Sequence, residues 1–167
     1  MTVLVAGLGN IFSSDDGFGV AVVDELSRRP LPAAVEVRDF GIRGIHLAYQ
    51  LLEPYDLVVL VDAVQRGGPP GTVYLIEADP EAQPGEDVPM DAHDLGPDAV
   101  LSLVPRLGGT VGPVVVIGCE PAGIDAGIGL SPAVQDAVGT AVQLVIDVVT
   151  GATEGRADVP GYSRPGG

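Results

Sequence analysis

Short runs of branched apolar residues alternate along this chain with segments whose apolar residues recur at every third or fourth position. Runs of the first kind are typical of buried strands, and the second spacing is typical of amphipathic helices. Strands are predicted at residues 3–6, 35–38, 57–61, 72–76 and 113–118. Helices are predicted at residues 17–28, 45–52, 98–107 and 131–149. Strands that alternate with helices indicate an α/β fold whose sheet is covered on both faces.

The fourth predicted strand breaks this alternation. Only residues 62–71 separate it from the third strand, and they include Arg-Gly-Gly-Pro-Pro-Gly at 66–71. That composition is typical of turns, whereas a parallel connection needs a longer crossover. We therefore expect the fourth strand to run antiparallel to the others.

Two segments fit neither pattern. Residues 77–98 hold eight acidic residues, no basic residue and three prolines before His93, so we expect a surface loop there. Residues 151–167 are rich in glycine, proline and polar residues, which predicts a disordered tail. Residues 1–150 fit a single domain, since one core typically organises about 100–200 residues.

The charge of the chain is strongly negative, with 23 acidic and 8 basic residues and a formal net charge of −15. Such a surface repels a phosphate backbone, which argues against a nucleic-acid partner. The apolar stretch at 138–149 contains Gln143 and Asp147 and is shorter than the ~20 residues of a membrane span, so no membrane partner is expected. Because there is no basic signal region and Cys119 is the single cysteine, we expect a cytoplasmic location.

A glycine-rich segment follows the first predicted strand and ends in two acids. Gly7 and Gly9 resemble the start of a dinucleotide-binding loop, but Phe12 stands where that loop needs its third glycine. Asp15 and Asp16 fall at the start of a predicted helix, where the helix dipole stabilises carboxylates and a side chain can cap free N–H groups. Both acids could be caps, although one cap does not explain two adjacent acids among flanking glycines.

Two further residues could form a metal site with Asp16. Asp62 follows the apolar third strand, and open α/β sheets place ligands at the carboxyl ends of strands, although a turn residue is the alternative. His93 lies in the acidic loop, where an ordinary exposed histidine is the alternative. If the first and third strands are neighbours, Asp16 and Asp62 open into one crevice, and two carboxylates with an imidazole suit nickel, zinc or cadmium. His46, within the second predicted helix, is interpreted as a packing or surface residue.

No side-chain nucleophile for covalent catalysis is predicted. Cys119 follows the last strand without a histidine at a recognisable spacing, and a free cysteine is more often a small buried residue. The sequence also lacks the Gly-x-Ser-x-Gly motif of serine hydrolases. Serine or cysteine catalysis is therefore not expected.

Four separated motifs nevertheless occur together in one order. They are Gly7-x-Gly9-Asn10 with Asp15-Asp16-Gly17-x-Gly19, then Val61-Asp62-Ala63, then His93, and finally Gly129-Leu130-Ser131-Pro132. With these motifs, residues 1 to about 150 resemble the maturation endopeptidases of nickel-iron hydrogenases. The resemblance implies a three-layer α/β/α sandwich of the phosphorylase/hydrolase-like type, whose mixed five-stranded sheet has one antiparallel strand.

The resemblance also implies an activity and a site. Members of that family remove a C-terminal extension from the hydrogenase large-subunit precursor after nickel has been inserted. Asp16, Asp62 and His93 match the family's metal-binding residues, which would engage nickel carried by the substrate, with no organic cofactor. The family's glycine-rich recognition segment matches Asp39, Gly41, Ile42, Arg43 and Gly44. Within it, Arg43 could also be an ordinary surface charge.

Two other functions are kept as alternatives. A peptidyl-tRNA hydrolase also begins with a strand and Gly-Leu-Gly-Asn, but that family continues with Pro-Gly where this chain has Ile11-Phe12, and tRNA calls for a basic surface. A non-enzymatic nickel-binding or chaperone module could use the same triad to hold metal or to escort the large subunit. The second alternative is distinguished from an enzyme by whether the precursor loses mass at its C-terminus.

Overall fold

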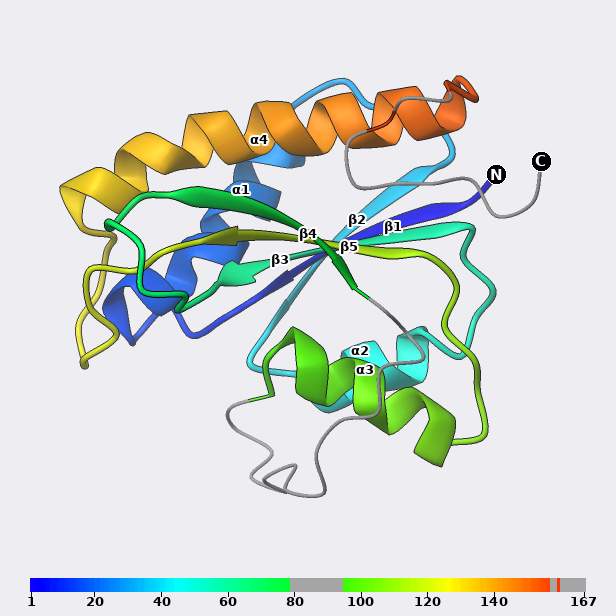
Figure 1. The fold of residues 1–167 in the computed structure, drawn as a ribbon, viewed down its shortest axis with the longest axis horizontal. Helices are drawn as coiled ribbons and strands as arrows, with labels where there is room; N and C mark the ends of the chain where they lie inside the picture. The colour runs from blue at the N-terminus through cyan, green and yellow to red at the C-terminus, as the bar shows by residue number, and fades with distance from the viewer. Residues whose placement is uncertain (79–94, 157–158, 160–167) are drawn as a thin grey trace.

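Five strands form one sheet that lies between two layers of helices. A computed structural model of the chain describes residues 1–78, 95–156 and 159. The strands are β1 (Val3–Leu8), β2 (Val35–Gly41), β3 (Leu57–Ala63), β4 (Val73–Ala78) and β5 (Val114–Cys119). The helices are α1 (Phe18–Leu26), α2 (Gly44–Gln50), α3 (Pro97–Arg106) and α4 (Pro132–Thr153), with a short 3-10 helix, η1 (Ser14–Gly17), before α1. Helices α1 and α4 cover one face and α2 and α3 the other (Figure 1), which confirms the predicted three-layer architecture.

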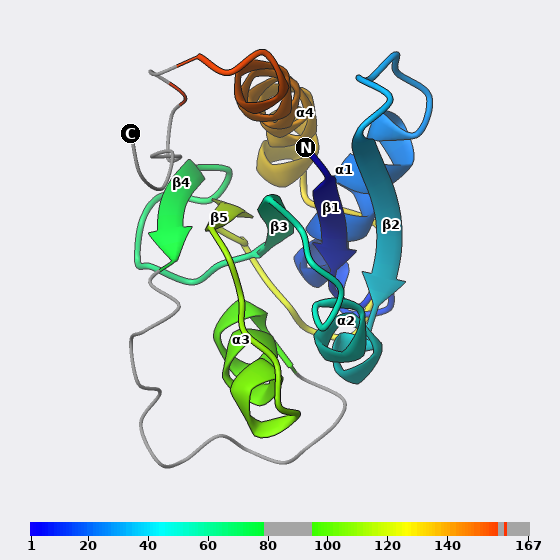
Figure 2. The same cartoon turned by 90° about the vertical axis from the view of Figure 1, so that its right-hand side faces the viewer.

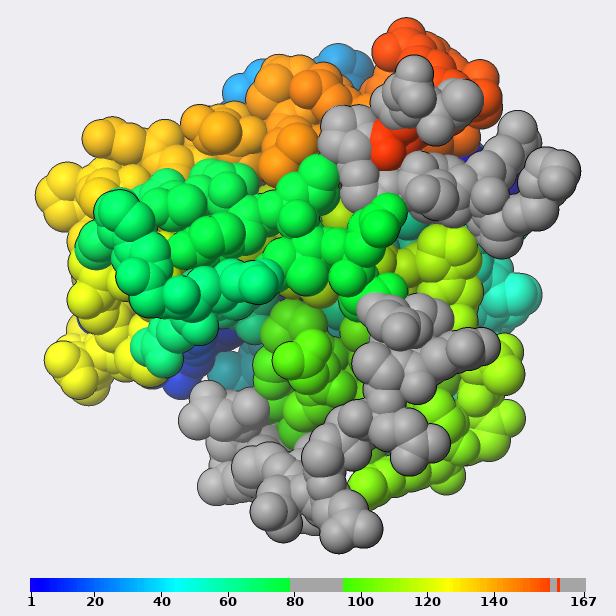
Figure 3. Space-filling view, in the orientation of Figure 1, coloured from blue at the N-terminus to red at the C-terminus, as the bar shows by residue number. Residues whose placement is uncertain are grey.

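The order of the strands brings four loops to one edge of the sheet. The order is β2-β1-β3-β5-β4, and β1, β2, β3 and β5 are parallel. β4 pairs with β5 in the antiparallel sense, as its short connection to β3 predicted. Figure 2 shows β2 and β4 at the two outer edges, and β4 lies at the surface in Figure 3. Because β1 and β3 are direct neighbours, with Gly7 opposite Val61, the loops that follow them begin side by side.

The three inner strands explain the uninterrupted apolar runs of the sequence. Every residue of β1 and β5 is buried, as is every residue of β3 except Ala63. Alternate residues supply the two cores, so Val3 and Val5 pack on the side of α1 and α4, and Leu4 and Ala6 on the side of α2 and α3. Strands that are covered on both faces need no polar alternation. This rigid centre positions the loops at the carboxyl ends of the strands.

The last helix is longer than predicted. The sequence places its end at residue 149, but α4 continues to Thr153, and Gly151 and Ala152 are buried. The predicted boundary between domain and tail at residue 150 therefore falls inside a core helix. Val159 also belongs to the core on this face and packs close to Gly151. The rest of the predicted tail, residues 157–158 and 160–167, lies outside the described residues.

The greater length of α4 means that length alone no longer argues against a membrane span, so the packing of the helix has to decide. By length and composition this helix of 22 residues could cross a membrane, which the shorter predicted stretch could not. However, Val134, Val138, Val142, Val145 and Val149 are buried in the core between the helix and the sheet. Core helices pass the same test of length and composition. The packing of α4 therefore identifies it as a core helix of the sandwich.

Candidate active site

A crevice of about 230 Å³ lies at the edge of the sheet where β1, β2 and β3 end. Its lining includes Asp16, from η1, and Asp62, from the end of β3. The prediction that these two acids open into one crevice is confirmed, because β1 and β3 are neighbours. No basic side chain occurs among the crevice residues in the described part of the chain. Two carboxylates without a lining base make this an environment that favours a cation.

The glycines of the first motif let the start of α1 pack directly on the backbone of the sheet. A Cβ on Gly19 would lie 2.2 Å from the carbonyl oxygen of Val61 and 2.3 Å from that of Leu8. A Cβ on Gly7 would lie 2.7 Å from the carbonyl oxygen of Gly19. No side chain fits at these distances, so glycine is required for the close approach. The motif therefore serves the packing of a helix on a sheet, which agrees with the rejection of the dinucleotide interpretation.

Gly9 brings the two acids of the crevice together. Its φ is +132°, and a Cβ there would lie 1.9 Å from the carbonyl oxygen of Asp16 and 3.5 Å from Oδ1 of Asp62. The backbone N–H of Asn10 donates to Oδ2 of Asp16 at 2.8 Å. The N–H of Ala63 donates to Oδ1 of Asp62 at 2.8 Å. Backbone N–H groups after β1 and at the end of β3 thus orient both carboxylates.

Asp15 differs from its neighbour, because it is 1% exposed and fastens a loop. Its carboxylate accepts hydrogen bonds from the N–H groups of Ala122 at 2.8 Å, Gly123 at 3.2 Å and Ser131 at 2.6 Å, and from the Ser131 hydroxyl at 2.8 Å. The N-cap residues of η1 and α1 make no side-chain capping bond, and the alternative interpretation of Asp15 as a cap of this helix is wrong, because its carboxylate binds residues after β5. Asp15 instead ties η1 to the loop between β5 and α4.

These hydrogen bonds keep Asp15 ionised. Burial by itself raises the pKa of the Asp15 carboxyl, because the charged form loses its water. The hydrogen bonds from Ser131, Ala122 and Gly123 outweigh burial and lower the pKa below its ordinary value. The loop between β5 and α4 is therefore held by the ionised Asp15 carboxylate, which accepts four hydrogen bonds from it.

His93, the third predicted ligand, lies outside the described residues, so the structure does not place it. Leu95 and Gly96, which follow it closely in the sequence, line the crevice. A Cβ on Gly44 would lie 2.7 Å from Cβ of Leu95, so this part of the chain packs against the start of α2. Among residues 1–78, 95–156 and 159, no three His, Cys, Asp or Glu side chains gather as a metal site. The metal triad stays a prediction.

The predicted recognition segment divides into residues that reach the crevice and residues that hold the loop. Gly41 and Ile42 line the crevice, and Ile42 is 48% exposed. Asp39 is exposed near the end of β2 and lines a neighbouring groove instead. The guanidinium of Arg43 turns back to the carbonyl oxygens of Asp39 at 2.7 Å and of the next residue at 3.3 Å. Gly44 is buried at the start of α2, so Ile42 supplies the side chain of this segment that lines the crevice.

Sequence reasoning assigned no role to several side chains that line the crevice. Gln65 comes from the loop after β3, and Pro121 and Ile124 come from the loop after β5. Asn10 belongs to a recognised motif without a role of its own, yet it lines the crevice and accepts a hydrogen bond from the N–H of Phe12 at 2.9 Å. The signal that could have found these residues is their place after the carboxyl end of a strand.

The two other candidate residues do not line the crevice. Cys119 is fully buried, and burial, followed by the negative charges of Asp15 and Glu120, raises the pKa of its thiol to about 11. A thiol with so little thiolate is a poor nucleophile, which supports the expectation that it is not catalytic. His46 is exposed on α2, as predicted, and lines a different hollow.

Sequence comparison connects the chain with hydrogenase maturation. Residues 20–148 match a family model described as hydrogenase maturation protease. The chain is 34% identical over 162 residues to the hydrogenase expression/formation protein HupD of Bradyrhizobium diazoefficiens, which covers 95% of this chain and 84% of that relative. It is 30% identical over 153 residues to the hydrogenase 2 maturation protease of Escherichia coli, which covers 87% of this chain and 89% of that relative.

Solved structures give the same result. The hydrogenase maturating endopeptidase HybD from Escherichia coli matches with a TM-score of 0.75 at 29% identity, over 93% of this chain and 94% of that one. The nickel-iron hydrogenase maturation protease HycI from Thermococcus kodakarensis matches with a TM-score of 0.67 at 27% identity, over 89% of this chain and 92% of that one. Sequence and fold therefore agree across nearly the whole chain.

Proposed function

Because this chain belongs to the hydrogenase maturation protease family, we propose that it removes the C-terminal extension of a nickel-iron hydrogenase large-subunit precursor after nickel insertion. Family membership supports the endopeptidase role. Beyond that role, we infer the substrate, the requirement for nickel and the residues that bind the metal.

The observation that carries the proposal is the pairing of Asp16 and Asp62 in one crevice. Asp16 comes from η1, after β1, and Asp62 from the end of β3, and the absence of a side chain on Gly9 lets its backbone lie close to the Asp16 carbonyl and the Asp62 carboxylate. Open α/β sheets bind ligands at this edge. A peptide in extended form can enter such an open crevice, with its scissile bond over the carboxylates.

In this proposal the crevice recognises nickel that the precursor already carries. Asp16 and Asp62 offer carboxylate oxygens, and His93 offers an imidazole nitrogen, which are suitable donors for a divalent transition metal. Leu95 and Gly96 in the crevice lining support a place for His93 nearby. Three protein donors leave positions for the precursor's own ligands. A precursor without nickel lacks this anchor, so it is not held for cleavage.

Cleavage in this proposal is hydrolysis by water. None of the crevice residues that the structure describes is Ser, Thr, Cys or Lys, which favours water over a side-chain nucleophile. The water oxygen adds to the scissile carbonyl carbon, the C–N bond breaks, and a carboxylate passes the water proton to the leaving amine. The substrate's nickel polarises the carbonyl as a Lewis acid. Asp16 and Asp62 are the two carboxylates among the crevice residues that the structure describes, so this role is assigned to them.

The test incubates the purified protein with nickel-loaded precursor and, separately, with nickel-free precursor. Intact-mass spectrometry should find loss of a C-terminal peptide from the nickel-loaded form only. Efficient cleavage of the nickel-free form would disprove recognition of nickel. Binding of the loaded precursor without any mass loss would instead support the alternative of a nickel-binding or chaperone module.

A further inference from the structure

A groove of about 410 Å³ lies beside the crevice, between α1 and the edge strand β2. Its lining is mainly apolar and includes Ile11, Val20, Ala21, Val37, Ile128 and Leu130. Two of these side chains are well exposed, since Ile11 is 48% and Ile128 84% accessible to solvent. Grooves of this volume with apolar walls are suited to side chains of a ligand.

The strand that borders the groove has a free edge. β2 pairs only with β1 in the described sheet, so its other edge is open to a further strand except at the Asp39 carbonyl oxygen, which accepts a hydrogen bond from the Arg43 guanidinium at 2.7 Å. An extended peptide can add to such an edge at the usual spacing of about 4.8 Å. Its alternate side chains would fall on the face of Val37 and Asp39, which is the face that borders the groove. Figure 2 shows α1 beside β2 on this side of the molecule.

The groove continues into the crevice at the carboxyl end of β2. Ile11 and Asp39 line the groove, whereas Asn10 and Gly41, close to them in the sequence, line the crevice. The N–H of Gly9 donates to the carbonyl oxygen of Gly41 at 2.9 Å, which joins the two walls at this corner. A chain that lies along β2 therefore ends beside the Gly41 and Ile42 wall of the crevice.

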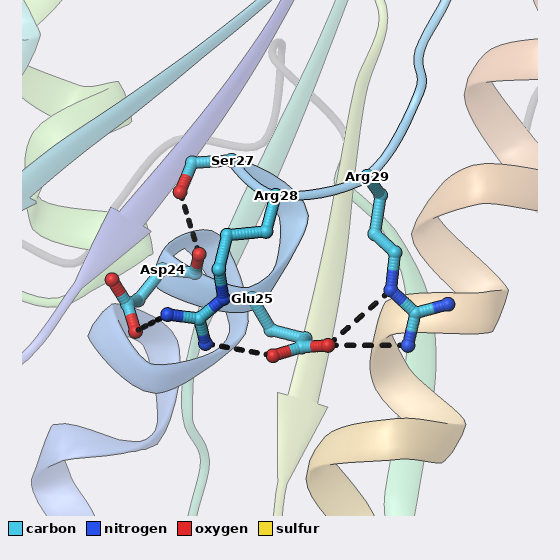
Figure 4. A network of polar contacts seen from close by, with 5 residues as sticks. All are labelled: Asp24, Glu25, Ser27, Arg28 and Arg29. Carbon is cyan, nitrogen blue, oxygen red and sulfur yellow. Dashed lines mark hydrogen bonds and ion pairs between the residues drawn. The ribbon is translucent and has the colours of Figure 1, made fainter.

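The two acids of the groove differ in their surroundings. At the end of α1, Asp24 lies 3.3 Å from Arg28, while Glu25 pairs with both Arg28 and Arg29 (Figure 4). Asp39 forms no ion pair with any residue that the structure describes. A basic side chain of a ligand would meet an uncompensated carboxylate there, and the net charge of −15 adds to the attraction.

We propose that this groove binds an extended, mainly apolar segment of the large-subunit precursor that adds to β2 and places a basic residue opposite Asp39. The assignment rests on the proposed function, because the precursor is its occupant. The groove contributes affinity for the precursor away from the scissile bond, and it leaves the chemistry to the crevice. Interactions of this kind lower KM without changing kcat.

The test compares cleavage kinetics of nickel-loaded precursor by three variants. Ala21→Arg fills the groove, and Asp39→Asn removes its uncompensated charge without changing its shape. Thr140→Arg, which introduces the same positive charge at an exposed site on α4, is the matched control. Ala21→Arg should raise KM about tenfold or more with kcat retained, and Asp39→Asn should raise KM and weaken its dependence on salt. Thermal unfolding followed by circular dichroism confirms that each variant is folded.

The outcomes separate this inference from the proposed function. If the unmodified protein does not cleave the precursor, the proposed function fails. If it does cleave, and Ala21→Arg and Asp39→Asn both keep the KM of Thr140→Arg, the groove does not bind the precursor. A change of oligomeric state in Ala21→Arg, with KM unaltered, would assign the groove to a second copy of the chain and would also overturn the inference.

Discussion

The carboxylate of Asp15 should be essential for the loop that closes one side of the crevice. The substitution Asp15→Asn keeps the shape of the side chain but replaces one acceptor oxygen with an N–H₂ donor. In the structure both oxygens face donors: Oδ1 accepts from the Ser131 N–H, and Oδ2 accepts from Ala122, Gly123 and the Ser131 hydroxyl. An asparagine cannot satisfy both sets, whichever way its amide is turned.

The size of the effect follows from these bonds. If the amide oxygen takes the place of Oδ2, the bond to the Ser131 N–H is lost, and a hydrogen bond to a charged group is worth about 1.5–3 kcal/mol. The bonds that remain lose their ionic character, which roughly halves their strength. We therefore expect Asp15→Asn to lower the free energy of unfolding by about 3 kcal/mol.

Urea denaturation at neutral pH measures this loss, with Asp136→Asn on the exposed face of α4 as the control. Because the pKa of Asp15 is lowered in the folded state, its stabilisation is complete above the ordinary value of 3.8 and is lost as the pH falls below it. The difference in free energy of unfolding between the unmodified protein and Asp15→Asn should therefore become smaller in that acid range. A loss below about 0.5 kcal/mol at neutral pH, no larger than that of a surface substitution, would refute the reasoning.

Three further predictions concern single residues. Gly9→Ala should lower the free energy of unfolding by about 2 kcal/mol or more, because its φ of +132° and the Asp16 carbonyl oxygen both exclude a Cβ. Its control is Gly139→Ala in α4, where a Cβ meets open space, and this variant should raise the free energy of unfolding by up to about 1 kcal/mol in the same urea titration. Cys119, with its pKa raised to about 11, should react with iodoacetamide at pH 8 only after unfolding, and rapid alkylation of the native protein would contradict its burial. Ile42→Ala should weaken precursor cleavage while Ile45→Ala, on the exposed surface of α2, should not; equal activities would remove Ile42 from substrate recognition.

The fold could be predicted because its signals are local. The five strands appear as short apolar runs, and the turn residues between the third and fourth runs were enough to reverse the direction of β4. The end of α4 could not be found in this way. Gly151 is a typical helix terminator, but here it stays in the helix because the core around Val159 packs against it.

The site was only partly accessible from the sequence. Asp16 and Asp62 could be paired because they follow the ends of two strands whose adjacency could be reasoned about. The sequence suggests a cap at Asp15 because the residue precedes a helix. Its actual partners, Ala122 and Ser131, lie more than a hundred residues away, and the local pattern carries no information about them. Arg43 differs, because its guanidinium donates to the carbonyl oxygens of Asp39 and Phe40 in its own loop, and the residue pattern does not distinguish that local role from an exposed charge.

The most direct test of the central claim is the intact mass of a nickel-loaded large-subunit precursor after incubation with four forms of the protein. These are the unmodified chain, Asp62→Ala, His93→Ala and the surface control Asp136→Asn. The account predicts loss of the C-terminal peptide with the unmodified chain and the control, and an unchanged precursor with Asp62→Ala and His93→Ala. Full processing by both of the latter would contradict the assignment of this crevice as the active site.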